Sequence, residues 1–177
     1  DTTPSPENRA YHRQLHALTR HITEDLGLNV LFVPMHMEES DVQLCNELKA
    51  ESSQPGSIRV LANDTLSPIE LRDTMSTAKL MIGFRLHSNI IAVSSGVPSL
   101  NIYYVDKGRV FFDQIKQSKF ALPIESVLRP DFGVVTHNLI QQLLKNQSAH
   151  RSAISSQTKI LRQDIRHAFN KAFPKSK

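Results

Sequence analysis

Short runs of apolar residues alternate with segments of helical character along most of the chain, and this alternation limits the folds open to it. The runs at Val30–Val33 and Leu80–Gly83 are too short and too uniformly apolar for surface helices, and such runs are typical of buried parallel strands. Parallel strands need long crossover connections, which helices usually supply. The sequence therefore predicts an α/β, Rossmann-like doubly wound domain with a mainly parallel sheet, closed by C-terminal helices.

Capping motifs indicate where several helices begin. Ser5-Pro6-Glu7 combines an N-cap serine, a proline at the first helical position and an acid in the first turn, which predicts a helix ending near Gly27. Ser40-Asp41-Val42-Gln43 and Ser67-Pro68-Ile69-Glu70 have the capping-box form. The other predicted elements are strands at Ser57–Leu61, Ser99–Tyr104 and Phe120–Leu122, and helices at Leu86–Ser95, Val110–Gln117 and from about Thr136 onward.

The composition excludes several classes of protein. A single cysteine, Cys45, rules out an intrachain disulfide and a multi-cysteine metal site, and its place on an apolar helical face favours a core residue over a nucleophile. No apolar run reaches the roughly 18 residues of a membrane-spanning helix. The net charge of +4 is not arranged as a basic stripe interleaved with aromatic residues. We therefore expect one domain over residues 1–177 with a flexible basic tail at 172–177, no integral membrane segment, no metal and no nucleic-acid partner.

Polar side chains follow each of the first four predicted strands. In an open parallel sheet, ligands bind outside the carboxyl ends of the strands, where helix N-termini supply free backbone N–H groups. The residues at this predicted edge are His36, Glu38, Glu39, Asp41, Asn63, Asp64, Arg85, His87, Ser88, Asn89, Tyr103, Tyr104, Asp106, Lys107 and Arg109.

Arg85 and His87 stand out because they share one strand-to-helix turn. An arginine there can bind a carboxylate or phosphate through two parallel hydrogen bonds, and a histidine in the first helical turn can donate a hydrogen bond or a proton. Lys107, after the neighbouring strand, adds a second cation, so the three side chains predict a pocket for a small dianion. The alternative is that Arg85 pairs with a nearby acid and His87 is an ordinary surface histidine. The acids from Glu38 to Asp41 lack a recognised zinc spacing and suit a helix N-terminus equally well.

The segment AKLMIGFRLHSNIIAVSSGVPSLNIYYVDKGRVFF, residues 78–112, resembles the C-terminal domain of the polysaccharide pyruvyltransferase family. The family pattern is met by Arg85-Leu86-His87, Gly96-Val97-Pro98 and Tyr104-x-x-Lys107. Two features depart from it. Val105 stands where members often have an acid, and the chain is about half the length of a two-lobed member.

The resemblance implies a glycosyltransferase-B-like enzyme that moves a carboxyethylidene group from phosphoenolpyruvate to two hydroxyls of a sugar and so forms a ketal, with no separate cofactor. It implies Arg85 and His87 as catalytic residues. Asp106, Glu38 and Asp41 are unranked candidates for the general base. The implied substrate contacts are Arg85, Leu86, His87, Lys107, Tyr104 and Asn89.

The resemblance also implies partners and a location. The acceptor is expected to be a saccharide of a cell-surface polysaccharide or its lipid-linked precursor, and the location cytoplasmic, including the inner face of the membrane. Residues 1–177 are expected to be the C-terminal lobe of a longer enzyme, and a homo-oligomer remains open. Two other functions also stay open. One is a nucleotide-sugar-dependent glycosyltransferase domain of the same architecture, and the other is an isolated, non-catalytic binding domain.

Overall fold

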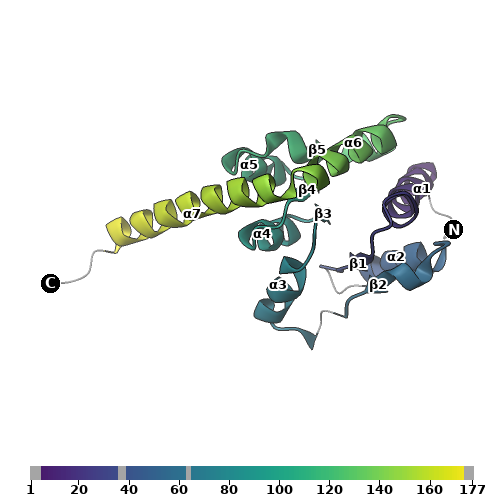
Figure 1. Cartoon of the computed structure of the whole chain (residues 1–177), viewed down its shortest axis with the longest axis horizontal. Helices are drawn as coiled ribbons and strands as arrows, with labels where there is room; N and C mark the ends of the chain where they lie inside the picture. The colour runs from purple at the N-terminus through teal and green to yellow at the C-terminus, as the bar shows by residue number, and fades with distance from the viewer. Residues whose placement is uncertain (1–4, 36–38, 63–64, 174–177) are drawn as a thin grey trace. The chain divides into compact units, whose positions relative to one another are not determined.

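The computed structural model describes residues 5–35, 39–62 and 65–173 (Figure 1). The chain divides into two compact units. Unit 1 comprises residues 1–71 and 124–141, and unit 2 comprises residues 72–123 and 142–177. Every strand pairing within the described residues is parallel, and helices separate the strands along the chain, so the α/β, Rossmann-like doubly wound class is confirmed.

Unit 1 contains a two-stranded parallel sheet. In it Leu31 lies opposite Arg59, and its core includes Leu15, Ile58 and Phe132, all buried. The elements in chain order are α1 (Pro6–Arg20), the π-helical turn η1 (His21–Asp25), β1 (Val30–Phe32), α2 (Glu39–Ala50), the 3-10 turn η2 (Pro55–Ser57), β2 (Ile58–Val60), η5 (Ile124–Leu128) and most of α6 (Phe132–Lys145).

Unit 2 contains a three-stranded parallel sheet in the order β3-β4-β5. Gly83 lies opposite Asn101, and Leu100, Ile102 and Phe112 are fully buried. The elements in chain order are β3 (Met81–Gly83), α4 (Leu86–Ser94), β4 (Ser99–Tyr103), α5 (Asp106–Gln114), the 3-10 turn η4 (Ser118–Phe120), β5 (Ala121–Pro123) and α7 (Gln147–Ala172). The remaining helix, α3 (Pro68–Ser76), runs from unit 1 into unit 2.

The first helix begins and ends as the sequence predicts. Ser5 is its N-cap, and the Ser5 hydroxyl accepts a hydrogen bond of 3.1 Å from the Asn8 N–H. Gly27, at the predicted end, has a φ of +60°, which L residues with a side chain adopt at a cost. The sequence did not predict that the last turn, His21–Asp25, is π-helical.

One of the two predicted capping boxes forms. The Ser67 N–H donates to the Glu70 carboxylate at 2.8 Å, and the Glu70 N–H donates to the Ser67 hydroxyl at 3.3 Å. The box predicted at Ser40 is wrong, because α2 already begins at Glu39 and Ser40 lies inside the helix. A serine with a glutamine three residues later matches the motif only when the preceding backbone is not helical.

The helix predicted at Val110–Gln117 begins four residues earlier, at Asp106. Gly108 lies in its first turn, pressed against β4. A Cβ added to Gly108 would lie 2.6 Å from the Tyr103 Cβ, so the helix backbone reaches the strand only because this residue has no side chain. Asp106 and Lys107 therefore belong to a helix and not to a loop.

Several other expectations have mixed outcomes. The strand at Val30–Phe32 is present, but the expectation that it is buried on both faces is wrong for Leu31, which is 42% exposed. The tail at 172–177 stays a prediction: Ala172 is the last residue of α7, and 174–177 lie outside the described residues. A single domain over 1–177 stays a prediction. Across 5–35, 39–62 and 65–173, no helix combines the length and the apolar character needed to cross a bilayer.

Candidate functional site

The turn between β3 and α4 holds the Arg-Leu-His motif of unit 2. Arg85 is the N-cap residue of α4, with an extended backbone (φ −115°, ψ 140°), and Leu86 is the first helical residue. His87 follows in the first turn with an exposed side chain, whereas Arg85 and Leu86 are half-buried. The first N–H groups of a helix have no partner within it, so this turn offers backbone donors beside a guanidinium and an imidazole.

A buried amide fixes the backbone of this turn. The Asn89 side chain, which is 0% exposed, donates from Nδ2 to the Gly83 carbonyl at 3.1 Å and to the Arg85 carbonyl at 3.1 Å. Asn101 Oδ1 in β4 lies 3.0 Å from the same Nδ2, so the two amide hydrogens are shared among three acceptors. The Ser88 hydroxyl adds a 2.7 Å bond to the Arg85 carbonyl. The prediction that Asn89 contacts substrate stays a prediction; in the structure its side chain is buried and supports the Arg85 carbonyl.

Gly83 makes room for that amide. A Cβ added to Gly83 would collide with the Asn89 side chain, at 2.6 Å from Asn89 Cγ and more closely still from Nδ2. The glycine at the carboxyl end of β3 is therefore a packing requirement of the Asn89 network. The turn is preorganised by contacts that lie below its surface, as a site for an anion requires.

The neighbouring turn between β4 and α5 lies at the same edge of the sheet. Because β3 and β4 are parallel and Gly83 pairs with Asn101, the residues after each strand emerge side by side. Tyr104 is 56% exposed, and Lys107 is exposed in the first turn of α5. The sheet thus brings Arg85, His87, Tyr104 and Lys107 to one edge of unit 2, and their part in binding stays a prediction.

Asp106, a predicted general-base candidate, is at this edge but is engaged by a cation. Its carboxylate lies 3.7 Å from Arg109 Nε, and Arg109 Nη1 also donates to Asp113 Oδ2 at 3.0 Å. The Asp106 side chain is 84% exposed, so water screens the pair strongly.

The other two general-base candidates do not belong to unit 2. Asp41 lies in α2 of unit 1, where its charge adds to burial in raising the pKa of two neighbouring groups. Burial is the larger cause for both, and the pKa rises to about 12 for Tyr11 and to about 11 for Cys45. A thiol with a raised pKa is a weak nucleophile, which fits the prediction that Cys45 is not catalytic. Glu38 lies outside the described residues, as do His36, Asn63 and Asp64.

The sequence analysis missed a chain of hydrogen bonds in unit 1. His21 Nδ1 lies 2.7 Å from Asp25 Oδ2, and His21 Nε2 lies 2.8 Å from His137 Nδ1. The spacing of His21 and Asp25 was visible as an i, i+4 pair, but nothing local connects them to α6, 116 residues away. Across the described part of the chain, no group of three or more His, Cys, Asp or Glu side chains is arranged to hold a metal ion.

These features define an α/β protein in which an Arg-Leu-His turn and the N-termini of two helices lie at one edge of a parallel sheet. Residues 2–106, more than half of the chain, match the family model described as polysaccharide pyruvyl transferase. The chain therefore belongs to the polysaccharide pyruvyl transferase family, a family of transferases. Neither the curated proteins nor the solved structures contain a significant match to it.

Proposed function

We propose that this chain binds phosphoenolpyruvate at the β3–α4 turn and takes part in transferring its pyruvyl group to a saccharide. The observation that carries the proposal is the position of Arg85 as the N-cap of α4, with its carbonyl held by Asn89 and His87 exposed two residues later. Phosphoenolpyruvate carries a carboxylate and a phosphate, and both suit a guanidinium beside free backbone N–H groups. Family membership supports a saccharide as the acceptor.

The proposed residues have separate roles. Arg85 holds the carboxylate or phosphate and stabilises charge that develops there. His87 donates a proton, either to the methylene carbon of the donor or to the departing phosphate, as histidine commonly does in general acid catalysis. Lys107 is a second anion contact and Tyr104 an uncharged one. Leu86 contributes its backbone N–H.

The proposed reaction then runs through simple steps. Protonation of the methylene carbon gives an oxocarbenium-like centre, and one sugar hydroxyl adds to it. Phosphate leaves with its bonding electron pair, and the second hydroxyl closes the ketal, each hydroxyl losing its proton. Asp106, which lies at the edge of unit 2 that carries the Arg-Leu-His turn, is proposed as the general base.

Calorimetric titration of the chain tests this proposal. Phosphoenolpyruvate should bind, whereas uridine and guanosine diphosphates should bind more weakly. Loss of a charge-assisted hydrogen bond predicts roughly 10-fold to 100-fold weaker binding in Arg85→Ala and a smaller loss in Arg85→Lys. His87→Ala should also weaken binding.

A matched control removes an arginine far from the motif in sequence. Arg129 is exposed in unit 1 and forms a 2.9 Å ion pair with Asp131, so Arg129→Ala should leave donor binding unchanged. Equal losses in Arg85→Ala and Arg129→Ala would point to non-specific charge effects. Tighter binding of a nucleotide than of phosphoenolpyruvate would instead support a nucleotide-sugar-dependent glycosyltransferase.

A further inference from the structure

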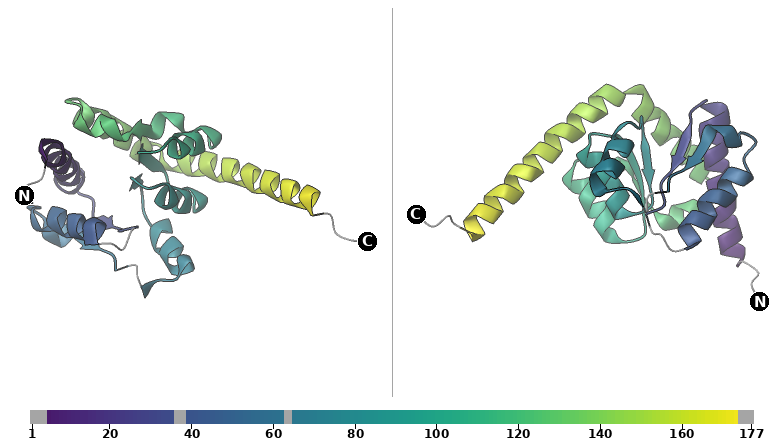
Figure 2. Two further views of the ribbon diagram at one scale, coloured as in Figure 1. Left: turned by 180° about the vertical axis from the view of Figure 1, so that it is seen from behind. Right: turned by 90° about the horizontal axis from the view of Figure 1, so that it is seen from below.

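The second half of α7 extends away from the rest of unit 2. Its first half is anchored, because Gln147 Nε2 donates to the Lys79 carbonyl at 2.7 Å and Arg151 Nη2 donates to the Ala78 carbonyl at 2.6 Å. Arg162 Nη2 still reaches the Ser94 carbonyl of α4, at 3.3 Å. From Arg162 to Phe173 every residue is exposed, and the ribbon runs on past α4 and α5 (Figures 1 and 2). We call residues 159–173 the distal segment.

The distal segment has an uncovered apolar face. Its large apolar side chains recur every four residues, at Leu161, Ile165, Phe169 and Phe173. Three of them are among the most exposed large apolar residues of the described chain, with 69% for Ile165, 62% for Phe169 and 66% for Phe173. At about 100° per residue, these side chains fall within an arc of roughly 120°. The rings of Phe169 and Phe173 lie against one another, 5.0 Å apart, and extend this face to the end of the helix.

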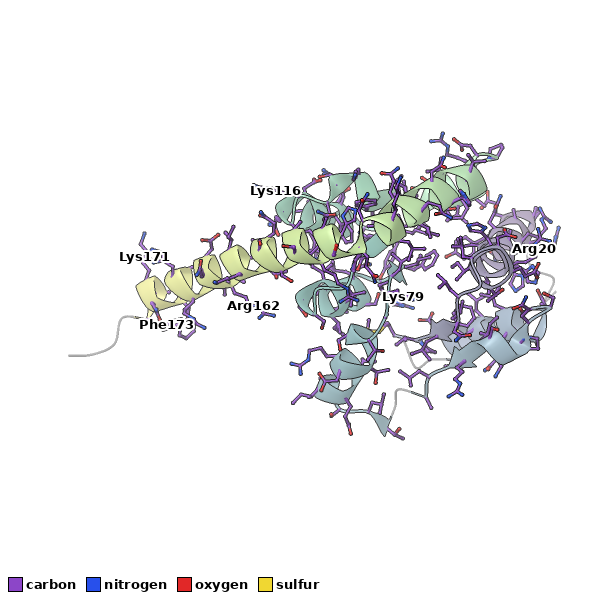
Figure 3. The ribbon with its side chains drawn as sticks, viewed as in Figure 1. Arg20, Lys79, Lys116, Arg162, Lys171 and Phe173 are labelled. Atoms are coloured by element: carbon purple, nitrogen blue, oxygen red, sulfur yellow. The ribbon has the colours of Figure 1, made fainter. Side chains whose placement is uncertain are left out.

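Cations border that face on one side. At helical spacing Arg166 and Lys159 fall within about 40° beyond one edge of the apolar arc, and Arg162 falls inside the arc. Lys171 brings the basic residues of the segment to four against one acid, Asp164. Figure 3 shows Arg162 and Phe173 projecting from the same side of the helix and Lys171 from the other. An apolar arc with a cationic flank is the pattern of helices that lie in the interface of a bilayer.

We propose that the distal segment docks this chain on the surface of an anionic lipid bilayer. The apolar arc would enter the boundary between headgroups and acyl chains, and the flanking cations would lie near lipid phosphates. Within the described residues no helix is suited to spanning, so the helix lies on the bilayer and does not cross it. A second copy of the helix fits this face less well. Pairing two segments would bring together eight basic side chains with only two acids, since each carries four and one.

Co-sedimentation of the full chain with vesicles tests the proposal. Vesicles of phosphatidylcholine alone are compared with vesicles of phosphatidylcholine and phosphatidylglycerol in equal parts. The chain should partition onto the anionic vesicles only, and added salt should weaken the binding, because part of it is electrostatic. No sedimentation with anionic vesicles at low salt would overturn the proposal.

Two double variants test separately how much the apolar face and the cations contribute to lipid binding. Ile165→Ser with Phe169→Ser should weaken partitioning on the order of 100-fold, because two large apolar side chains no longer enter the interface. Lys159→Gln with Arg166→Gln should weaken it about 30-fold, as expected for the loss of two cations near an anionic surface. All four side chains are exposed, so folding should be unchanged.

Matched controls make the assignment specific. Ile160 is 48% exposed on the opposite side of the helix, so Ile160→Ser should bind like the wild type. Lys116→Gln with Lys145→Gln removes the same charge elsewhere in unit 2 and should have little effect. Equal losses in the control and test variants would refute a dedicated face. So would a dimer, seen by light scattering, that dissociates in Ile165→Ser with Phe169→Ser while lipid binding is unaffected.

Discussion

Replacing Gly83 by alanine tests how the Arg-Leu-His turn is held in place. The added Cβ would lie 2.6 Å from Asn89 Cγ, inside any normal contact distance, so the amide must move. The hydrogen bonds from Asn89 to the Gly83 and Arg85 carbonyls would then stretch or break. The perturbation therefore acts on the turn through the residue that supports it.

The expected destabilisation follows from two costs and one gain. Overpacking of a buried site costs about 1–3 kcal/mol, and leaving a buried polar group poorly paired costs about 1–3 kcal/mol. Alanine restricts the unfolded chain more than glycine does, and this stabilises the folded protein by about 0.4–1 kcal/mol. We expect Gly83→Ala to lower the free energy of unfolding by about 2–4 kcal/mol, which is large against typical stabilities of about 5–15 kcal/mol.

Urea unfolding followed by far-ultraviolet circular dichroism measures this effect. Gly133→Ala is the matched control, since no heavy atom lies within 4 Å of a Cβ added at Gly133, and it should be neutral or stabilising by up to about 1 kcal/mol. In an Asn89→Ala background the colliding amide is absent, so Gly83→Ala should then cost less than about 1 kcal/mol. A cost below about 0.5 kcal/mol in the wild-type background, or an equal cost in both backgrounds, would refute the reasoning.

Three titrating groups give further predictions. With its pKa raised from 9.0 to about 11, Cys45 should react with a disulfide reagent at about pH 8 roughly 100-fold more slowly than an ordinary thiol, and Asp41→Asn should speed the reaction. Hydrogen bonds from Ser67 lower the pKa of Glu70, so the contribution of this carboxylate to stability is present above its unfolded value of about 4.3 and is lost as the pH falls through the folded value. Titration of Glu70 by nuclear magnetic resonance should show its pKa rising in Ser67→Ala, and an unchanged value would contradict the capping box. Burial, followed by the charge of a nearby lysine, lowers the pKa of His150, so its contribution to stability is complete above about pH 6.5 and declines below it. Urea midpoints should therefore fall more steeply with acid in the wild type than in His150→Phe.

Local rules predicted those parts of the fold that depend on neighbouring residues. The Ser67–Glu70 box and the Ser5 cap each involve groups three residues apart, so the sequence carries the whole interaction. The first turn of α5 was not predicted as helix because it contains Gly108, and glycine is a poor helix former. The place of Gly108 in the helix depends on its close approach to Tyr103 of β4. That contact is tertiary, and no local pattern contains it.

The candidate site also has features that the sequence predicts and features that depend on contacts between distant elements. Arg85 and His87 are visible in the sequence because they lie in one turn, and the parallel pairing of β3 and β4 brings Lys107 to the same edge. The role of Asn89 was not predicted, because its hydrogen bond to Asn101 spans two elements. A polar residue that follows a strand is expected to contact a ligand. Only its burial in the structure shows whether it instead supports the backbone of the turn.

The central claim is that phosphoenolpyruvate binds at the N-terminus of α4, and its most direct test is a titration of the isotope-labelled chain with phosphoenolpyruvate followed by amide resonances. The account predicts the largest shifts at the amides of Leu86, His87 and Ser88, with smaller shifts near Lys107 and none in Arg85→Ala. Shifts confined to other parts of the chain, or shifts that persist in Arg85→Ala, would contradict it.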